Sequence, residues 1–253
     1  MSGDPKDGFF TRGTGFGDFL GIGPEEYDLP QSLAKPVILV VHQVLIAAFE
    51  ILRNRSHDIG GAIEDQVTLW LLNVIENDLR KNATVRGFNS RTFEKVTRQQ
   101  EVENYDGKKI RKTPDLVFAP RQGTSSERIL STHFGLFVEC KPVGPDHPVP
   151  SAYCDAGLCR FVNGDYAWAM TEGMMVGYAR SGRTIEKHLQ PVIAAGRPSL
   201  QLASQLSAVS SPSARAGPKH EALHVSEHHR RFPWPHGKGI ACRIRVYHSW
   251  HHC

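Results

Sequence analysis

Apolar residues along the chain recur at spacings that separate helices from strands. The longest apolar run extends from Pro36 to Leu52, and Pro36 is well placed in the first turn of a helix. His42, Gln43 and Glu50 interrupt this run, which is shorter than the roughly 20 apolar residues that cross a bilayer. The pattern therefore predicts a buried helix and no membrane partner.

A second helix is expected from about Ile59 to Lys81, where apolar residues including Ile63 recur at helical spacing. Asp58 precedes it and has the side chain of an N-cap residue. Glu64 and Thr68 are one helical turn apart, so Glu64 should lie on the border of the apolar face.

Strand patterns follow the second helix. Residues 92–102 alternate weakly, and the Asp-Gly pair in 104–107 is typical of a tight turn. Residues 108–119 are expected to form a strand, and 134–142 form the clearest strand of the sequence, ended by a proline. Residues 152–180 are expected to be helical.

The order of these elements predicts an α/β fold, in which helices flank one mixed sheet. Residues 1–35 are expected to be a loosely ordered arm and 36–193 the α/β core. Residues 194–219, rich in Ser, Ala, Pro and Gly, are expected to be a flexible linker. Residues 220–253 form a His-rich segment, and 239–250 within it alternate like a late, half-buried strand.

Composition adds little to this picture. The chain has 253 residues, 40% hydrophobic and 22% charged, as in an ordinary globular protein. The net charge of +4 is compatible with a polyanionic partner without requiring one. The five cysteines form no Cys-x-x-Cys pair and no secretory signal precedes them, so reduced thiols in a cytoplasmic protein are expected.

The chemistry is concentrated in Pro114-Asp115 and Glu139-Cys140-Lys141. Residues two apart in a strand point to the same face, so Glu139 and Lys141 should share a face and Cys140 should point away. Asp115 lies near the end of the neighbouring strand. Two carboxylates at one sheet edge attract a hard cation such as Mg²⁺, and a lysine beside it can orient water or stabilise phosphorane charge.

The acidic-x-Lys triplet also occurs at residues 4–6 and 106–108, but there it lies in polar segments. Only the triplet at 139–141 lies in an apolar run, where ionisable groups are costly without partners. An edge strand that carries a simple Glu–Lys ion pair is the structural alternative.

These residues resemble the PD-(D/E)xK nuclease superfamily, whose fold is that of restriction endonucleases. Its pattern is a Glu on the first core helix, Pro-Asp on one strand and Glu-x-Lys on the next, matched here by Glu64, Asp115 and Glu139-Cys140-Lys141. The resemblance implies that Asp115, Glu139 and the backbone carbonyl of Cys140 bind Mg²⁺, with Mn²⁺ as a substitute. It implies Lys141 as the catalytic lysine and Glu64 as an auxiliary acid. One departure is the 23-residue interval between Asp115 and Glu139, which implies a long hairpin loop.

Basic residues flank the expected site. Lys108, Lys109, Arg111 and Lys112 directly precede Asp115 and are candidates for phosphate contacts. A solvated strand face would explain them equally well. Downstream, Arg160 is a candidate for contact with the scissile phosphate, as is Tyr166.

Eight of the 13 histidines follow residue 219. His220, His224 and His228 would form one stripe on a helix, a spacing that suits Zn²⁺. A basic, partly protonated surface near nucleic acid is the preferred interpretation of this segment.

The sequence thus predicts a metal-dependent nuclease that acts on nucleic acid, with DNA endonuclease activity preferred. A catalytically silent nucleic-acid-binding or protein-interaction module with the same fold is the alternative. A homodimer or a protein partner is compatible with both hypotheses.

Overall fold

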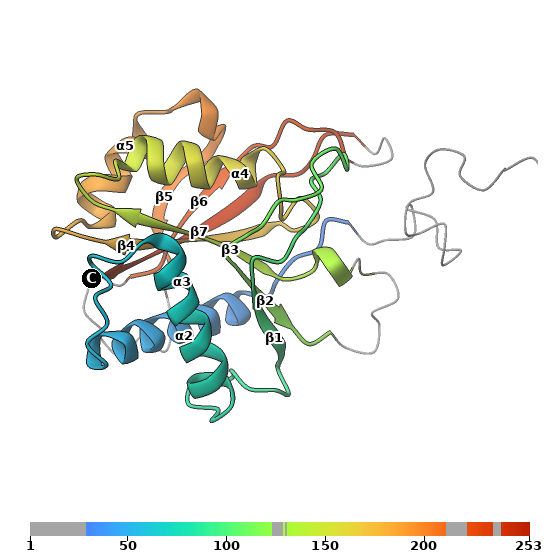
Figure 1. Cartoon of the computed structure of the whole chain (residues 1–253). Helices are drawn as coiled ribbons and strands as arrows, with labels where there is room; N and C mark the ends of the chain where they lie inside the picture. Colours follow the sequence, from blue (N-terminus) through green and yellow to red (C-terminus); the bar gives the residue numbers. More distant parts are fainter. Residues whose placement is uncertain (1–28, 123–128, 130, 211–221, 235–238) are drawn as a thin grey trace, which may run out of the picture.

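The computed structural model describes residues 29–122, 129, 131–210, 222–234 and 239–253 (Figure 1). Its centre is one seven-stranded mixed sheet with the strand order β1-β2-β3-β4-β7-β6-β5. The strands are β1 (Phe93–Arg98), β2 (Leu116–Pro120), β3 (Leu136–Val143), β4 (Glu172–Ala179), β5 (Leu202–Ala208), β6 (His224–His228) and β7 (Ile244–His252). The central strands β3, β4 and β7 are parallel, and the neighbours on either side pair antiparallel. The expected α/β class is confirmed. Most of the expected N-terminal arm lies outside the described residues.

Helices cover both faces of this sheet, with α2 and α3 on one side and α4 and α5 on the other (Figure 1). The helices on the first face are α2 (Lys35–Asn54), α3 (Glu64–Asn73) and its continuation η2 (Val74–Arg80). The remaining helices are η4 (Ser131–His133), η5 (Val149–Leu158), α4 (Cys159–Val162), η6 (Ile185–Leu189), α5 (Gln190–Ala194) and η7 (Pro198–Leu200).

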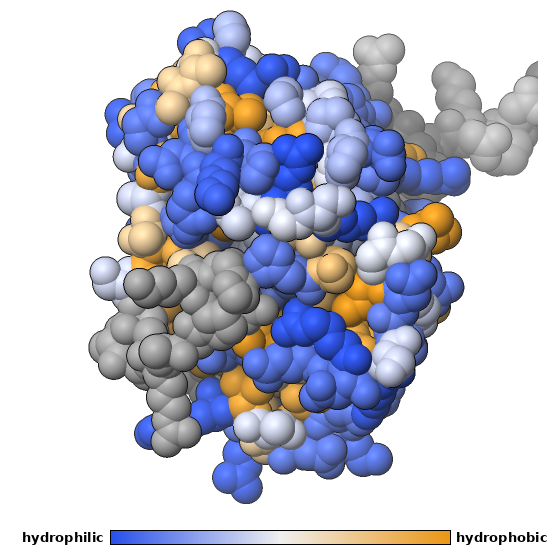
Figure 2. All heavy atoms as spheres, turned by 90° about the vertical axis from the view of Figure 1, so that its left-hand side faces the viewer, coloured by the Kyte–Doolittle hydropathy of each residue, from blue (hydrophilic) through white to orange (hydrophobic). Residues whose placement is uncertain are grey.

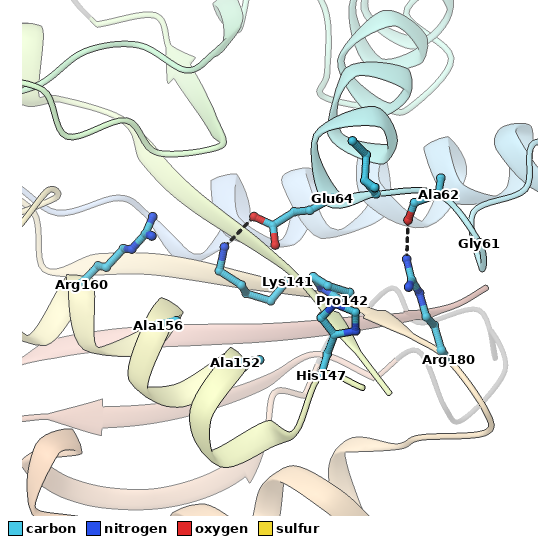
Figure 3. Close-up of a pocket in the computed structure, with 11 residues that line it drawn as sticks. Gly61, Ala62, Glu64, Lys141, Pro142, His147, Ala152, Ala156, Arg160 and Arg180 are labelled. Carbon is cyan, nitrogen blue, oxygen red and sulfur yellow. Dashed lines mark hydrogen bonds and ion pairs between the residues drawn. The ribbon is translucent and has the colours of Figure 1, made fainter. Parts of the chain in front are cut away.

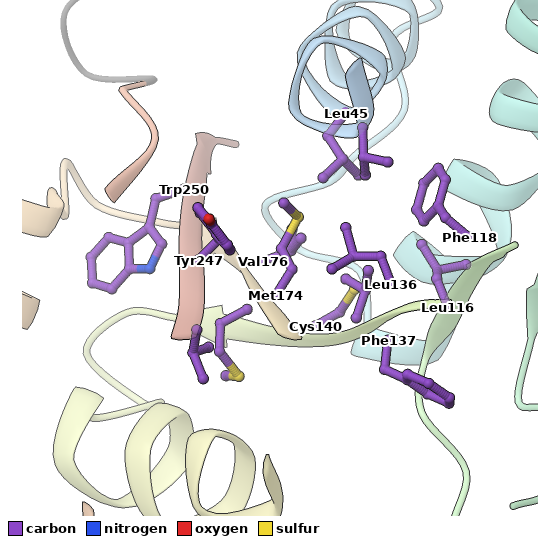
Figure 4. Close-up of a cluster of buried hydrophobic side chains, with 14 of the residues drawn as sticks. Leu45, Leu116, Phe118, Leu136, Phe137, Cys140, Met174, Val176, Tyr247 and Trp250 are labelled. Atoms are coloured by element: carbon purple, nitrogen blue, oxygen red, sulfur yellow. The ribbon is translucent and has the colours of Figure 1, made fainter. Parts of the chain in front are cut away.

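The helix α2 forms where the first apolar run predicted it. Among the described residues, α2 is the one helix long and apolar enough to cross a membrane, a test that a buried core helix also passes. Its fully buried residues recur every three or four positions and include Ile38, Val41, Leu45 and Phe49. Leu45 lies over the face of β3 that carries Leu136 and Cys140 (Figure 4). This apolar stripe therefore packs against the sheet, as expected of a core helix.

The start of the second helix was predicted wrongly. The helix begins at Glu64, and Ile63, expected on its apolar face, is 73% exposed. Asp58 caps a preceding turn, because its Oδ1 accepts a hydrogen bond of 2.8 Å from the Gly61 backbone N–H. This turn competes with a helix for the same backbone groups.

The expected helix over 152–180 is correct only in its first part. Helical structure ends at Val162, and Gly164, with φ of +69°, turns the chain towards β4. Every residue of β4 is buried. A parallel strand that is covered on both faces is apolar throughout, so it lacks the alternation that distinguishes a strand from a buried helix.

The expected linker at 194–219 is also wrong in its first half, which contains η7 and the edge strand β5. Residues 211–221 lie outside the described residues. The late strand β7 lies between β4 and β6 in the middle of the sheet and is largely buried, not half-buried as expected. The C-terminal segment is thus part of the same core. The side of the molecule near the C-terminus is mostly hydrophilic, with small hydrophobic patches (Figure 2).

Candidate active site

Asp115 and Glu139 meet where β2 and β3 separate. The two strands pair over three positions, the last being Leu116 with Val138, and the same register places Asp115 opposite Glu139. At this point a side chain takes the place of a backbone partner. The Asp115 Oδ2 accepts a hydrogen bond of 2.7 Å from the Cys140 backbone N–H. The separation of the strands therefore fixes one carboxylate against the other strand.

Glu139 and Lys141 lie on the same side of β3, as the two-residue period predicts, and form an ion pair there. Cys140 faces α2 on the other side (Figure 4). Glu139 and Lys141 are both buried, with 0% and 8% of the residue exposed. Lys141 Nζ lies 2.9 Å from Glu139 Oε1 and 2.6 Å from Glu64 Oε1. Glu64 reaches Lys141 because it is the first residue of α3, whose N-terminus lies over the end of β3 (Figure 3).

The segment after β3 closes over Glu139. Arg160 Nη1 lies 2.8 Å from Glu139 Oε1, and the Tyr166 hydroxyl donates a hydrogen bond to Oε2. Gly157 permits this approach, since a Cβ there would lie 2.6 Å from Met175 Cε. The sequence placed Arg160 and Tyr166 near substrate, whereas both contact the carboxylate itself. Gly157 lies inside the predicted helix, where a glycine is a signal of close packing.

Burial and repulsion between the carboxylates perturb the site. Burial and the nearby Glu139 raise the pKa of Asp115 to about 7. Burial also raises the pKa of Glu139, although Lys141 and Arg160 act in the opposite direction. Burial alone would lower the pKa of Lys141, but Glu139 and Glu64 outweigh it and raise the pKa. Lys141 is thus held as a cation between two carboxylates.

The donor atoms suit a hard divalent cation. Asp115, Glu139 and the Cys140 carbonyl offer oxygen ligands of the kind that Mg²⁺ prefers. Glu139 Oε1 is buried with two cations beside it, 2.9 Å from Lys141 Nζ and 2.8 Å from Arg160 Nη1. Within the described residues, no three His, Cys, Asp or Glu side chains are grouped to hold a metal.

The basic segment before Asp115 is a loop, not the expected strand from residue 108. Its two sides are linked by one isolated β-bridge, between Val102 and Lys112, and by a hydrogen bond of 3.1 Å from the Asn104 backbone N–H to the Lys109 carbonyl. Lys109 and Lys112 form ion pairs of 3.0 and 3.2 Å with Asp165, and Lys108 forms one of 3.1 Å with Asp106. Asp165 directly precedes Tyr166, so these pairs tie the loop to the segment that covers Glu139. The lysines 108 and 109, with Arg111, are exposed.

A groove of about 530 Å³ opens beside Lys141. In Figure 3, Arg160 lies on one side of Lys141 and Arg180 on the other. The residues that line the groove are Gly61, Ala62, Ile63, Glu64, Lys141, Pro142, His147, Ala152, Ala156, Arg160 and Arg180. The groove thus connects the carboxylate cluster to a further cation at the end of β4.

Four of the six described histidines after residue 219 are buried. His224 and His228 lie on the strand β6, not on a helix, and His220 lies outside the described residues. His228, His248 and His251 are fully buried, and burial lowers the pKa of each. No zinc ligand set is formed among the described histidines and cysteines. The preferred interpretation of a partly protonated surface is therefore wrong for these buried histidines.

Comparisons of the chain with protein-family models, curated proteins and solved structures returned no match. The function proposed below therefore depends on the geometry of the site and on the sequence motif.

Proposed function

We propose that this protein is a metal-dependent nuclease of the PD-(D/E)xK type that hydrolyses phosphodiester bonds in DNA. The observation that carries the proposal is the convergence of Asp115, Glu139 and Lys141 where β2 and β3 separate. Glu64, at the start of α3, completes the order of residues that the motif requires. The topology supports the proposal, because a mixed sheet with antiparallel β2–β3 and parallel β3–β4 suits a restriction-endonuclease-like core.

Asp115, Glu139 and the backbone carbonyl of Cys140 would hold Mg²⁺, with Mn²⁺ as a substitute. A bound Mg²⁺ supplies Lewis acidity and lowers the pKa of water. Arg160 and Lys141 contact Glu139, and both are long side chains that can turn towards a phosphate. Binding of a metal ion to Glu139 would therefore require Lys141 and Arg160 to move partly away from its carboxylate.

Lys141 serves in this proposal as a positive charge beside the scissile phosphate. Its two ion pairs favour the protonated ammonium, which can orient water and stabilise the negative charge of the transition state. Tyr166 holds the Glu139 carboxylate in place by its hydrogen bond. Arg160 and the basic loop at Lys108–Lys112 would bind the backbone of the nucleic acid, a salt-dependent and sequence-independent attraction.

One observation favours the alternative of a catalytically silent binding module. Glu139 already has two cations and a tyrosine as partners. If a metal ion does not displace these partners from Glu139, the same site binds a nucleic acid phosphate through Arg160 and Lys141 without cleaving the strand. Metal-dependent turnover separates the two functions.

The test is cleavage of plasmid and single-stranded DNA by the purified protein in Mg²⁺, Mn²⁺ or EDTA. Asp115→Asn and Lys141→Met preserve side-chain shape and should each reduce cleavage by about 10²–10³-fold. Asp78→Asn on η2 and Lys187→Met on η6 are matched controls away from the site and should leave cleavage unchanged.

Cleavage that persists in EDTA, or that both site variants retain, would refute the proposed site. Absence of cleavage combined with metal-independent DNA binding that Lys141→Met weakens would instead support the binding module.

A further inference from the structure

Arg180 is a cation in the groove with an incomplete set of partners. One guanidinium nitrogen donates a hydrogen bond of 2.6 Å to the Ala62 carbonyl. Its Nε is buried without a hydrogen-bond partner, and Arg180 forms no ion pair with Asp or Glu among the described residues. The Arg180 side chain lines the groove, and phosphate oxygens match the donor geometry of a guanidinium.

The rest of the groove suits the uncharged parts of a nucleotide. Ile63 stands at its wall with 73% of the residue exposed. Ala152 and Ala156 of η5 form part of the opposite wall (Figure 3). Apolar walls combined with a small number of charged side chains, here Glu64, Lys141, Arg160 and Arg180, are typical of sites that bind small organic ligands.

The position of the groove relates it to the proposed chemistry. Lys141 is both a member of the carboxylate cluster and a lining residue, and Arg160 and Arg180 lie on opposite sides of it (Figure 3). A nucleic acid strand with one phosphate at Lys141 would therefore place a neighbouring nucleotide in the groove. The volume of about 530 Å³ is in the range of small-molecule sites and does not accommodate a double helix.

We propose that this groove is a nucleotide subsite, which binds an unpaired nucleotide next to the scissile phosphate. Arg180 binds the phosphate of that nucleotide, and Ile63 contacts its sugar or base. The subsite makes single-stranded DNA, or an unpaired end, the preferred substrate. This inference rests on the proposed nuclease function for its orientation, but DNA binding tests it without catalysis.

The experiment measures binding in EDTA by fluorescence anisotropy, with a short labelled single-stranded oligodeoxynucleotide and a blunt duplex of the same sequence, over a range of KCl concentrations. Arg180→Gln should weaken single-strand binding about tenfold and reduce the slope of log K against log salt by about 0.7. Arg243→Gln is the matched control, because Arg243 is an exposed arginine before β7, beyond the opposite end of the sheet from Arg180.

A second pair of variants tests the apolar wall. Ile63→Ser should weaken single-strand binding about threefold without a change in the salt slope, because it removes apolar contact and no charge. Ile240→Ser changes an isoleucine that is 65% exposed elsewhere and should have no effect. Both isoleucines are exposed, so neither substitution should unfold the protein, and circular dichroism checks this for all four variants.

The inference is supported if Arg180→Gln and Ile63→Ser weaken single-strand binding and their controls do not. It is overturned if the wild type does not bind single strands, if it prefers the blunt duplex, or if Arg180→Gln and Arg243→Gln have equal effects. Selective weakening without any cleavage in Mg²⁺ would keep the subsite and refute the nuclease. Cleavage in Mg²⁺ with unchanged single-strand binding in both groove variants would keep the nuclease and refute the subsite.

Discussion

His228 is a buried histidine whose two ring nitrogens both have hydrogen-bond partners. Its Nδ1 lies 2.7 Å from the Leu200 carbonyl oxygen, and its Nε2 lies 2.7 Å from Ser226 Oγ. Ser226 Oγ also lies 2.8 Å from His248 Nε2, and His248 Nδ1 lies 3.0 Å from the Tyr153 hydroxyl. This chain of hydrogen bonds suits neutral imidazoles, so we predict that His228 makes the protein sensitive to acid.

The magnitude follows from the two protonation equilibria. Burial lowers the pKa of His228 to about 4, whereas the unfolded chain has the ordinary value near 6.5. As the pH falls below 6.5, the unfolded state binds a proton that the folded state does not, and the free energy of unfolding decreases. For this residue the decrease between pH 7.5 and pH 5 is about 2 kcal/mol.

The variant His228→Gln removes this titration. At pH 7.5 it should lower the free energy of unfolding by about 1–3 kcal/mol, because buried polar partners lose their hydrogen bonds. Between pH 7.5 and pH 5, the free energy of unfolding of this variant should decrease by about 2 kcal/mol less than that of the wild type. The measurement is urea unfolding followed by tryptophan fluorescence at both pH values. His229→Gln, at the exposed neighbouring position, should behave as the wild type does. An equal loss between the two pH values in all three proteins would refute the reasoning.

Two further predictions concern packing and the site. Gly177→Ala should lower the free energy of unfolding by about 2–3 kcal/mol in urea, because its Cβ would lie 2.5 Å from Trp250 Cδ1. In Gly60→Ala the nearest atom would be 3.8 Å away, so a comparable loss in that variant would contradict the steric explanation. Tyr166→Phe removes the hydrogen bond to Glu139 and should lower the free energy of unfolding by about 1–2 kcal/mol. It should also slow cleavage by about tenfold at saturating metal, and an unchanged rate would show that Tyr166 does not position the carboxylate.

The strand pattern predicted the local geometry of the site but not all of the elements around it. The strand β3 forms close to where it was expected, because apolar residues on either side of Glu139 and Lys141 favour a buried strand. Pro142, expected to end the strand, lies inside it, since β3 pairs with β4 as far as Val143. Residues 172–179 were expected to be helical, because a strand apolar on both faces has no period of two. Residues 202–208 were expected to be a linker, because an edge strand that is mostly exposed resembles a polar loop in composition.

The sequence by itself determined that Glu139 and Lys141 share one face of a strand and that Cys140 faces the other, because this depends only on the strand period. Only the tertiary structure decided what the Glu139 carboxylate contacts. Arg160 and Tyr166 reach it from a segment more than twenty residues later in the chain, and Glu64 reaches Lys141 across 77 residues. Such contacts depend on how the helices pack over the end of the sheet, and no local pattern of residues encodes that packing.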